Sequence, residues 1–222
     1  MKQNRKYFQR FVTWFFAALA IFLFQCGKKK ELPSGNLLLR SGMDSLAGDS
    51  FPGIAGEYSA VARTRPAVSW GLPVGDNAGV SYYKIRGIIP GDHYGEDWNG
   101  TGGGNTDMGD LVLAVADGVV FYSGDFRPGW GNVVRMIHNA GSLAEPKYVE
   151  SLYAHLSTVW VDPGNAMKKG EPLGTIGSAD GVYHAHLHFE IRTQPGMPIP
   201  WPEGADTSKF VSPSDFIREH SK

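Results

Sequence analysis

The feature that most constrains this chain's fold is a succession of short apolar or alternating runs from about Ser69 onward. Turn-forming residues separate these runs, a pattern typical of β-strands rather than of long amphipathic helices. The 222 residues include 29 glycines and 14 prolines, which suits a fold of many short strands and turns. We therefore expect a mostly β domain built on an antiparallel sheet.

Individual strands can be predicted from the same pattern. Two apolar runs flank Asp117-Gly118 in "DLVLAVADGVVFYSG" and predict a hairpin. The segments "GNVVRMIH" and "YVESLYAHL" predict two further strands, and "VDPGNAMKKGEPLGTIGS" predicts a turn followed by a strand. "HAHLHFEIRT" predicts the last strand. In "VSPSDFIREH", Ser212 as N-cap and Pro213 at the first helical position predict a short closing helix.

The predicted last strand holds three of the chain's seven histidines. Side chains alternate between the two faces of a strand, so one face is apolar and would pack on a core. The other face carries polar groups that could bind or flank a metal ion: His184, His186, His188 and Glu190.

A catalytic zinc ion takes three protein ligands and one water, so further ligands must come from elsewhere in the chain. "GDHYGEDWNG" offers His93 and Asp97 four residues apart. "LYAHLS" offers His155 on another predicted strand. Two other histidines remain as candidates, His138 at the end of a strand and His220 in the C-terminal tail.

These residues carry a family resemblance. "HYGEDW", "LVLAVADGVV", "GWGNVVRMIH", "LYAHLS", "VDPGNAMKKGEPLGTIG" and "HLHFEI" occur in the order and approximate spacing of the LytM/lysostaphin-type (M23) zinc metallopeptidases. The resemblance runs from about His93 to Arg192 and more weakly back to about Ser69. It implies a LytM-like antiparallel sheet, in the form of an open barrel or sandwich.

Carried over position by position, the resemblance implies that His93, Asp97 and His188 bind Zn²⁺. It implies that His155 and His186 perform the acid–base and oxyanion work of metal-activated water attack on a peptide bond. The implied substrate is the peptide crosslink of bacterial peptidoglycan. Glu190 shares the predicted histidine face and could orient an imidazole.

A second reading is a non-catalytic or autoinhibited regulator of the same fold, which binds cell wall or activates other wall hydrolases. All five site positions are present, which favours the enzyme. The chain departs from the family pattern in "NGTGGGNTDMGD" and "NAGSLAEPKYVES", two long loops that we expect to border the groove and to affect substrate choice.

Other polar and aromatic residues have simpler interpretations. His184 is expected to line the groove wall rather than bind metal, and His138 and His220 to be structural or solvated. Asp107 and Asp110 flank a glycine-rich loop and are expected to form turns. The remaining candidates are two tryptophans that fit either the core or the groove: Trp98 and Trp130.

The N-terminus carries a targeting pattern. A basic stretch precedes an apolar run over residues 11–24, which has the length of a signal-peptide core and is short for a membrane span. The chain's single cysteine, Cys26, follows at once and resembles the lipidation site of a bacterial lipoprotein. Phe24 and Gln25 stand where small residues are usual, so an uncleaved anchor and a chance cysteine are the alternatives.

We therefore predict four segments: a lipoprotein-type signal with its cysteine (1–26), a tether (27–68), an M23-type peptidase domain (69–193) and a C-terminal extension with a short helix (194–222). The expected location is the outside of a membrane, anchored by lipid and facing the cell wall in the periplasm or cell envelope. A formal net charge of -1 argues against a nucleic-acid partner. The expected partners are peptidoglycan and the membrane, and we expect a monomer.

Overall fold

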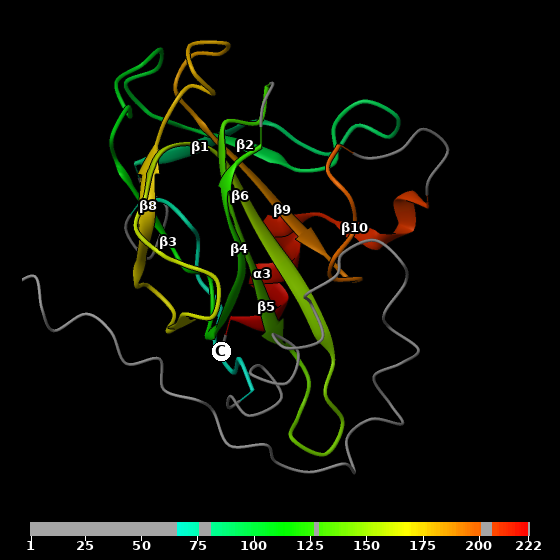
Figure 1. Ribbon diagram of the computed structural model, residues 1–222. Helices are drawn as coiled ribbons and strands as arrows, with labels where there is room; N and C mark the ends of the chain where they lie inside the picture. The colour runs from blue at the N-terminus through cyan, green and yellow to red at the C-terminus, as the bar shows by residue number, and fades with distance from the viewer. Residues whose placement is uncertain (1–65, 76–80, 127–128, 201–205, 222) are drawn as a thin grey trace, which may run out of the picture. The chain divides into compact units, whose positions relative to one another are not determined.

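Antiparallel strand pairing organises the part of the chain that the computed structural model describes (Figure 1): residues 66–75, 81–126, 129–200 and 206–221. These residues all belong to the unit formed by Met43–Lys222. Within them, ten strands form one sheet. The strands are β1 (Tyr82–Arg86), β2 (Glu96–Gly100), β3 (Leu111–Leu113), β4 (Gly118–Asp125), β5 (Asn132–Asn139), β6 (Tyr148–Val159), β7 (Ala166–Met167), β8 (Pro172–Ile176), β9 (Leu187–Arg192) and β10 (Phe210–Val211).

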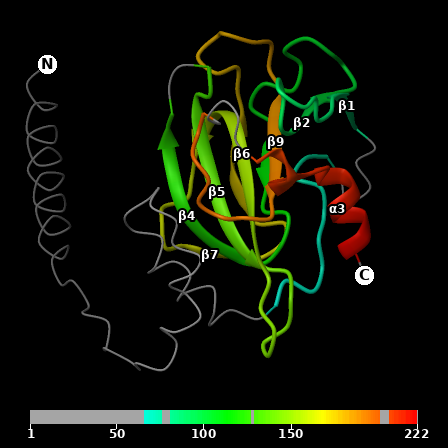
Figure 2. The same cartoon turned by 90° about the vertical axis from the view of Figure 1, so that its right-hand side faces the viewer.

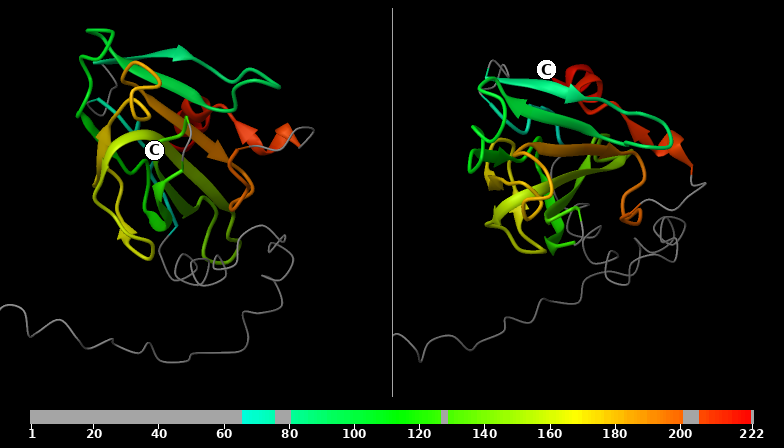
Figure 3. Two further views of the ribbon diagram at one scale, coloured as in Figure 1. Left: turned by 45° about the horizontal axis from the view of Figure 1, so that its top comes forward. Right: turned by 90° about the horizontal axis from the view of Figure 1, so that it is seen from above.

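The main path through the sheet runs β1-β2-β9-β6-β5-β4-β7, and β8, β3 and β10 branch from it. Strands β4, β5 and β6 lie side by side in Figure 2, and Figure 3 shows the β1–β2 pair next to β9. Every pairing is antiparallel. The predicted mostly antiparallel β fold is therefore confirmed, as are the strands predicted in "GNVVRMIH" and "YVESLYAHL".

The predicted hairpin around Asp117-Gly118 is wrong. Strand β3 pairs with β8, whereas β4 pairs with β5 and β7. The backbone between β3 and β4 bonds elsewhere, since Ala114 donates to Glu171 O and accepts from Gly170 N–H. The Asp117 carboxylate also accepts from Lys169 N–H. The turn therefore joins strands with different partners, which an apolar run cannot indicate by itself.

The two faces of β9 differ as the alternation predicts. Leu187, Phe189 and Ile191 are fully buried in the main hydrophobic core. His188 and Glu190 point to the opposite face and are also buried. The strand begins only at Leu187, however, so His184 and His186 precede it rather than lying on it.

The closing helix α3 (Pro213–His220) forms as predicted and packs against β9. The Ser212 hydroxyl accepts from Asp215 N–H, which satisfies one of the free donors at the helix start. Ile217 is buried in the core. A short 3-10 turn, η2 (Thr207–Lys209), precedes β10.

The segment before β1 joins the same core through Ala67, Trp70 and Val74. The predicted signal, Cys26 and nearly all of the predicted tether lie outside the described residues. In the described ranges, no helix has both the length and the apolar character needed to cross a bilayer.

His138 is a structural histidine that is fully buried on β5. Its Nδ1–H donates to Asp117 O at 3.0 Å, and Nε2 lies 2.7 Å from Ser151 Oγ. Burial outweighs the Asp117 contact and lowers the pKa of His138 to about 4, below the 6.5 of an unfolded chain.

We predict that His138 makes folding stability depend on pH between about 6.5 and 4. In this window the unfolded chain binds the proton more readily than the folded one, so the free energy of unfolding falls as pH falls. Between pH 7.5 and 5, His138 alone would remove about 2 kcal/mol. Urea unfolding of the wild type and of His138→Gln, which cannot titrate there, measures the difference. Equal losses in both proteins would contradict the prediction.

Candidate metal centre

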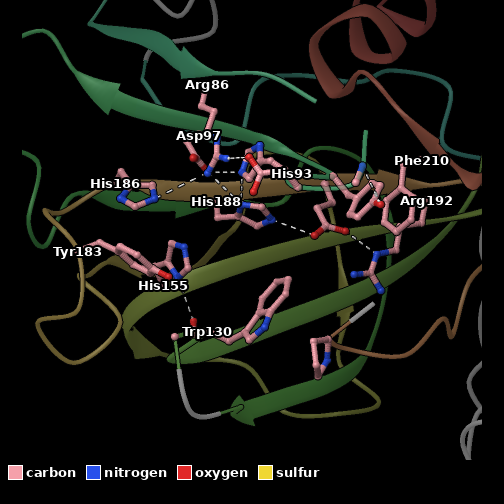
Figure 4. Close-up of a pocket in the computed structure, with 16 residues that line it drawn as sticks. Arg86, His93, Asp97, Trp130, His155, Tyr183, His186, His188, Arg192 and Phe210 are labelled. Atoms are coloured by element: carbon pink, nitrogen blue, oxygen red, sulfur yellow. Dashed lines mark hydrogen bonds and ion pairs between the residues drawn. The ribbon is translucent and has the colours of Figure 1, made fainter. Parts of the chain in front are cut away.

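The pairing of β2 with β9 creates the centre of the site (Figure 4). Asp97 on β2 stands directly opposite His188 on β9. His93 comes from the turn just before β2. Between His93 and Asp97, Gly95 lets the two backbones approach closely, because a Cβ there would lie 2.7 Å from Phe189 O. The sheet register thus brings together two residues that are 91 positions apart.

Three potential ligand atoms converge. Nε2 of His93 lies 3.0 Å from Oδ1 of Asp97 and 3.0 Å from Nδ1 of His188, and the last two atoms are 2.9 Å apart. Ligands at 2.0–2.1 Å from a tetrahedral ion stand about 3.3 Å from one another. The set therefore fits a zinc-sized ion after shifts of a few tenths of an ångström. It is the one group of three or more such residues found among those described.

Both histidines of the cluster have a fixed ring orientation. Nδ1–H of His93 donates to Gly87 O at 2.8 Å, which leaves Nε2 unprotonated toward the cluster. Nε2 of His188 lies 2.9 Å from Oε1 of Glu190, so Nδ1 is the nitrogen that faces His93 and Asp97. Each ring thus presents the nitrogen that an ion would need.

Behind His188 lies a chain of buried charges. Glu190 accepts from Nε of Arg192 at 2.6 Å, and Arg192 lies 3.5 Å from Glu150. Glu150 in turn pairs with Arg135 through two hydrogen bonds of 2.7 and 2.9 Å. Buried charges of this kind are tolerated only when paired. The alternating charges therefore hold Glu190, and through it His188, in place.

The same network sets the charge of the cluster without an ion. Burial would raise the pKa of Asp97, but the hydrogen bond from His188 and the nearby His93 ring outweigh it and hold the pKa well below its usual range. For His188, burial would lower the pKa, but hydrogen bonds to Asp97 and Glu190 raise it to about 9. His188 then carries a proton between two carboxylates at neutral pH, and a bound ion would take the place of the proton on Nδ1.

His155 lies beside the cluster on β6, in an unusual backbone conformation. Its φ of 64° is in the left-handed region, which costs a non-glycine residue on the order of 1–3 kcal/mol and is most often found at functional sites. Its backbone N–H and ring Nδ1 both face Trp130 O, at 2.9 and 3.2 Å. Burial, with repulsion from His188 and His186, lowers the pKa of His155 to about 3, so the ring is neutral at pH 7.

His186 is the fifth residue of the group. Its Nδ1–H donates to His184 O at 2.8 Å, and its Nε2 lies 3.8 Å from Oδ1 of Asp97. The ring centroids of His186 and His155 are 4.8 Å apart. The structure therefore gathers all five residues that the family resemblance singled out.

A groove of about 530 Å³ opens onto these residues. Trp130 packs edge-to-face on His188, with ring centroids 5.4 Å apart. Tyr183, about half exposed, lies over His155 with ring centroids 5.0 Å apart. The rest of the lining includes Arg86, Asp92, Tyr94, Pro200 and Phe210.

The other sequence candidates lie away from the groove. His184 is exposed and absent from the groove lining, which corrects the expectation that it forms the wall. His220 stacks on Phe216, and Trp98 belongs to the core. Asp110 accepts from the Tyr82 hydroxyl. Sequence reasoning missed Tyr183 and Arg192, although Arg192 follows Glu190 by two residues and therefore shares its face.

The model of peptidase family M23 matches residues 91–199, which contain all five clustered residues. These residues are a peptidase M23 domain. The murein hydrolase activator NlpD of Salmonella dublin is 35% identical over 103 residues, 44% of this chain and 25% of the relative. The DD-carboxypeptidase/endopeptidase Mpg of Neisseria meningitidis is 38% identical over 113 residues, 47% of this chain and 24% of the relative.

The solved structure of lysostaphin from Staphylococcus simulans superposes with a TM-score of 0.46 at 26% identity, over 63% of this chain and 50% of that one. The chain spans a quarter or less of the length of the curated relatives that it matches. The M23 domain is thus what this chain shares with them.

We predict that Glu190→Gln weakens the affinity of the M23 domain for Zn²⁺ by about 10- to 100-fold, because a neutral amide cannot support the His188 ring as a carboxylate does. Competition with a chromogenic chelator measures this affinity. Glu145→Gln on the exposed loop between β5 and β6 is the matched control and should bind as the wild type does. Equal affinities in all three proteins would show that Glu190 does not support the centre.

Proposed function

We propose that this protein is a zinc-dependent endopeptidase that hydrolyses the peptide crosslinks of bacterial peptidoglycan. The observation that carries the proposal is the convergence of three ligand atoms beside two further histidines, at the base of an open groove in an M23 domain. A purely structural histidine cluster would not need an open groove above it.

In this proposal Nε2 of His93, Oδ1 of Asp97 and Nδ1 of His188 hold the ion. When bound, Zn²⁺ supplies a Lewis acid that polarises a peptide carbonyl and lowers the pKa of water. Asp97 is the one negatively charged ligand of the set, and the two imidazole ligands are neutral. The bound ion would therefore keep a net positive charge.

His155 and His186 then handle protons. Each ring has its Nδ1–H bound to a backbone carbonyl, Trp130 O and His184 O, and so keeps Nε2 as a proton acceptor. The ring that accepts a proton from the attacking water would become an imidazolium and could pass that proton to the leaving amine. The other ring could donate to the developing oxyanion only after taking up a proton at its own Nε2. Their ring separation of 4.8 Å allows both to reach one scissile peptide.

The groove suits an extended peptide. Trp130 against His188 and Tyr183 against His155 line it with aromatic rings, while its open side leaves room for the branched peptides of a cell wall. The relative Mpg is named a carboxypeptidase and endopeptidase, which agrees with this substrate class. Export and lipid anchoring through Cys26 would place the domain where such substrates lie.

A regulatory role is the second candidate, because the relative NlpD is named a murein hydrolase activator. A domain that only activates other hydrolases has no need for a complete ligand set. The five clustered residues therefore favour catalysis, and the following experiment separates the two functions.

The test compares the full chain with His188→Ala and His186→Ala. We expect about one zinc per wild-type chain and release of new peptide amino groups from purified peptidoglycan. His188→Ala should lose both zinc and activity, because it removes a ligand. His186→Ala should keep the zinc and lose activity by about 100-fold or more, as for a missing acid or base.

Metal content by mass spectrometry and end-group release by amine labelling provide the two readouts. Zinc binding without hydrolysis of any wall preparation would contradict the enzyme and favour the regulator. Wild-type protein that binds no zinc would contradict the centre itself.

A further inference from the structure

The long glycine-rich loop between β2 and β3 contacts the segment that precedes β9. Oδ1 of Asn105 accepts from the backbone N–H of Ala185 at 2.8 Å and lies 3.3 Å from Nδ1 of His184. Ala185 is fully buried, whereas Asn105 and His184 are exposed. The loop therefore reaches the histidine segment with a side chain rather than bordering the groove with its backbone.

The loop has its own anchors and can hold Asn105 in a defined place. Asp107 is buried, and its Oδ2 accepts from Gly100 N–H at 3.3 Å. At the far end of the loop, Gly109 N–H donates to Ile176 O at 2.9 Å, and Ile176 N–H donates to Asp110 O at 2.8 Å. The loop is thus tied to β2 at one end and to β8 at the other.

The segment that carries His186 has little support of its own. Strand β9 begins at Leu187, and His186 forms only an isolated bridge to Gly177, with an N–H to O distance of 3.3 Å. The hydrogen bond from Ala185 N–H to Asn105 is shorter than the one from His186 N–H to Gly177 O, so it holds the backbone here more strongly. Without it, the N–H side of the peptide unit between His184 and Ala185 would lose its hydrogen-bond partner.

The decisive geometry lies in one peptide unit. The N–H of Ala185 and the C=O of His184 belong to the same planar group, so fixing one fixes the direction of the other. Asn105 holds the N–H side, and the His186 ring donates its Nδ1–H to the C=O side at 2.8 Å. The hydrogen bond from the exposed loop thereby restricts the orientation of the His186 imidazole in the groove.

We propose that Asn105 is a positioning residue, which orients the His186 imidazole by fixing the peptide plane between His184 and Ala185. The inference rests on the proposed function in assigning His186 to proton transfer. It replaces the expectation that this loop chiefly selects substrate. Asn105 itself stays outside the groove, since it is absent from the groove lining.

Three variants of the full chain test the proposal. Asn105→Ala removes the acceptor, whereas Asn105→Asp keeps an oxygen at the same place. Thr106→Ala is the matched control, because it removes a hydrogen bond of 2.8 Å within the same loop, to Gly103 O, and leaves the histidine segment untouched. All four proteins are assayed on a purified crosslinked peptidoglycan fragment, with zinc content and melting temperature measured alongside.

We expect Asn105→Ala to lower kcat by roughly 10- to 100-fold with KM and zinc content unchanged, because small displacements of a catalytic group cost this much. Asn105→Asp should recover most of the loss, and Thr106→Ala should match the wild type. An unchanged kcat in Asn105→Ala, an increase in KM alone, or an equal defect in Thr106→Ala would overturn the proposal.

A second readout does not depend on activity. In ¹⁵N-correlated NMR spectra of the histidine rings, wild-type His186 should show a single tautomer protonated at Nδ1, and Asn105→Ala should show averaged ring nitrogens. An unchanged His186 spectrum in Asn105→Ala would overturn the inference. If the wild type shows this tautomer but hydrolyses no wall preparation, the proposed function fails and the positioning role is still decided by the spectra.

Discussion

The site depends on one constraint: a histidine presents a chosen nitrogen to a ligand or substrate only when the proton on its other nitrogen has a fixed acceptor. Every histidine that faces the centre meets this condition. The acceptors of the four rings are Gly87 O for His93, Trp130 O for His155, His184 O for His186 and Glu190 for His188. The remaining nitrogens are the ones available to an ion or a peptide.

The fold supplies these acceptors at places where regular structure is interrupted. His155 interrupts β6 with a left-handed backbone, and His186 stands just before β9 begins. The carbonyls that accept from the rings, Gly87 O, Trp130 O and His184 O, all lie outside the named strands, so no strand ladder occupies them. Glu190 is the exception, since it acts from within β9 and needs the buried Arg192 to balance its charge. The sheet thus sets the positions of the site residues, and the irregular segments beside its strands set the orientations of their rings.

The sequence predicted the parts of the structure that depend on local pattern. Alternation predicted the two faces of β9, and the Ser212-Pro213 pair predicted the start of α3. The family resemblance, carried over position by position, predicted that His93, Asp97 and His188 come together. The first two follow from side-chain direction or capping over a few residues, whereas the third came from the family resemblance.

Features that depend on pairing between distant segments could not be predicted from local sequence patterns. The hairpin predicted at Asp117-Gly118 failed because β3 finds its partner in β8, far along the chain. His184 does not lie on the predicted strand face, because β9 begins at Leu187, three residues after His184. Asn105 and Ala185 are 80 positions apart in the sequence, so no local sequence pattern could predict their hydrogen bond. The lipid anchor at Cys26 and the four segment boundaries stay predictions.

If His93, Asp97 and His188 hold one metal ion, anomalous diffraction at the zinc absorption edge should locate it between them. Crystals of the zinc-loaded protein should show one strong peak, with Nε2 of His93, Oδ1 of Asp97 and Nδ1 of His188 each about 2.0–2.2 Å away. A peak at another group of residues, or coordination through Nε2 of His188 with Glu190 displaced, would contradict a centre formed by these three residues.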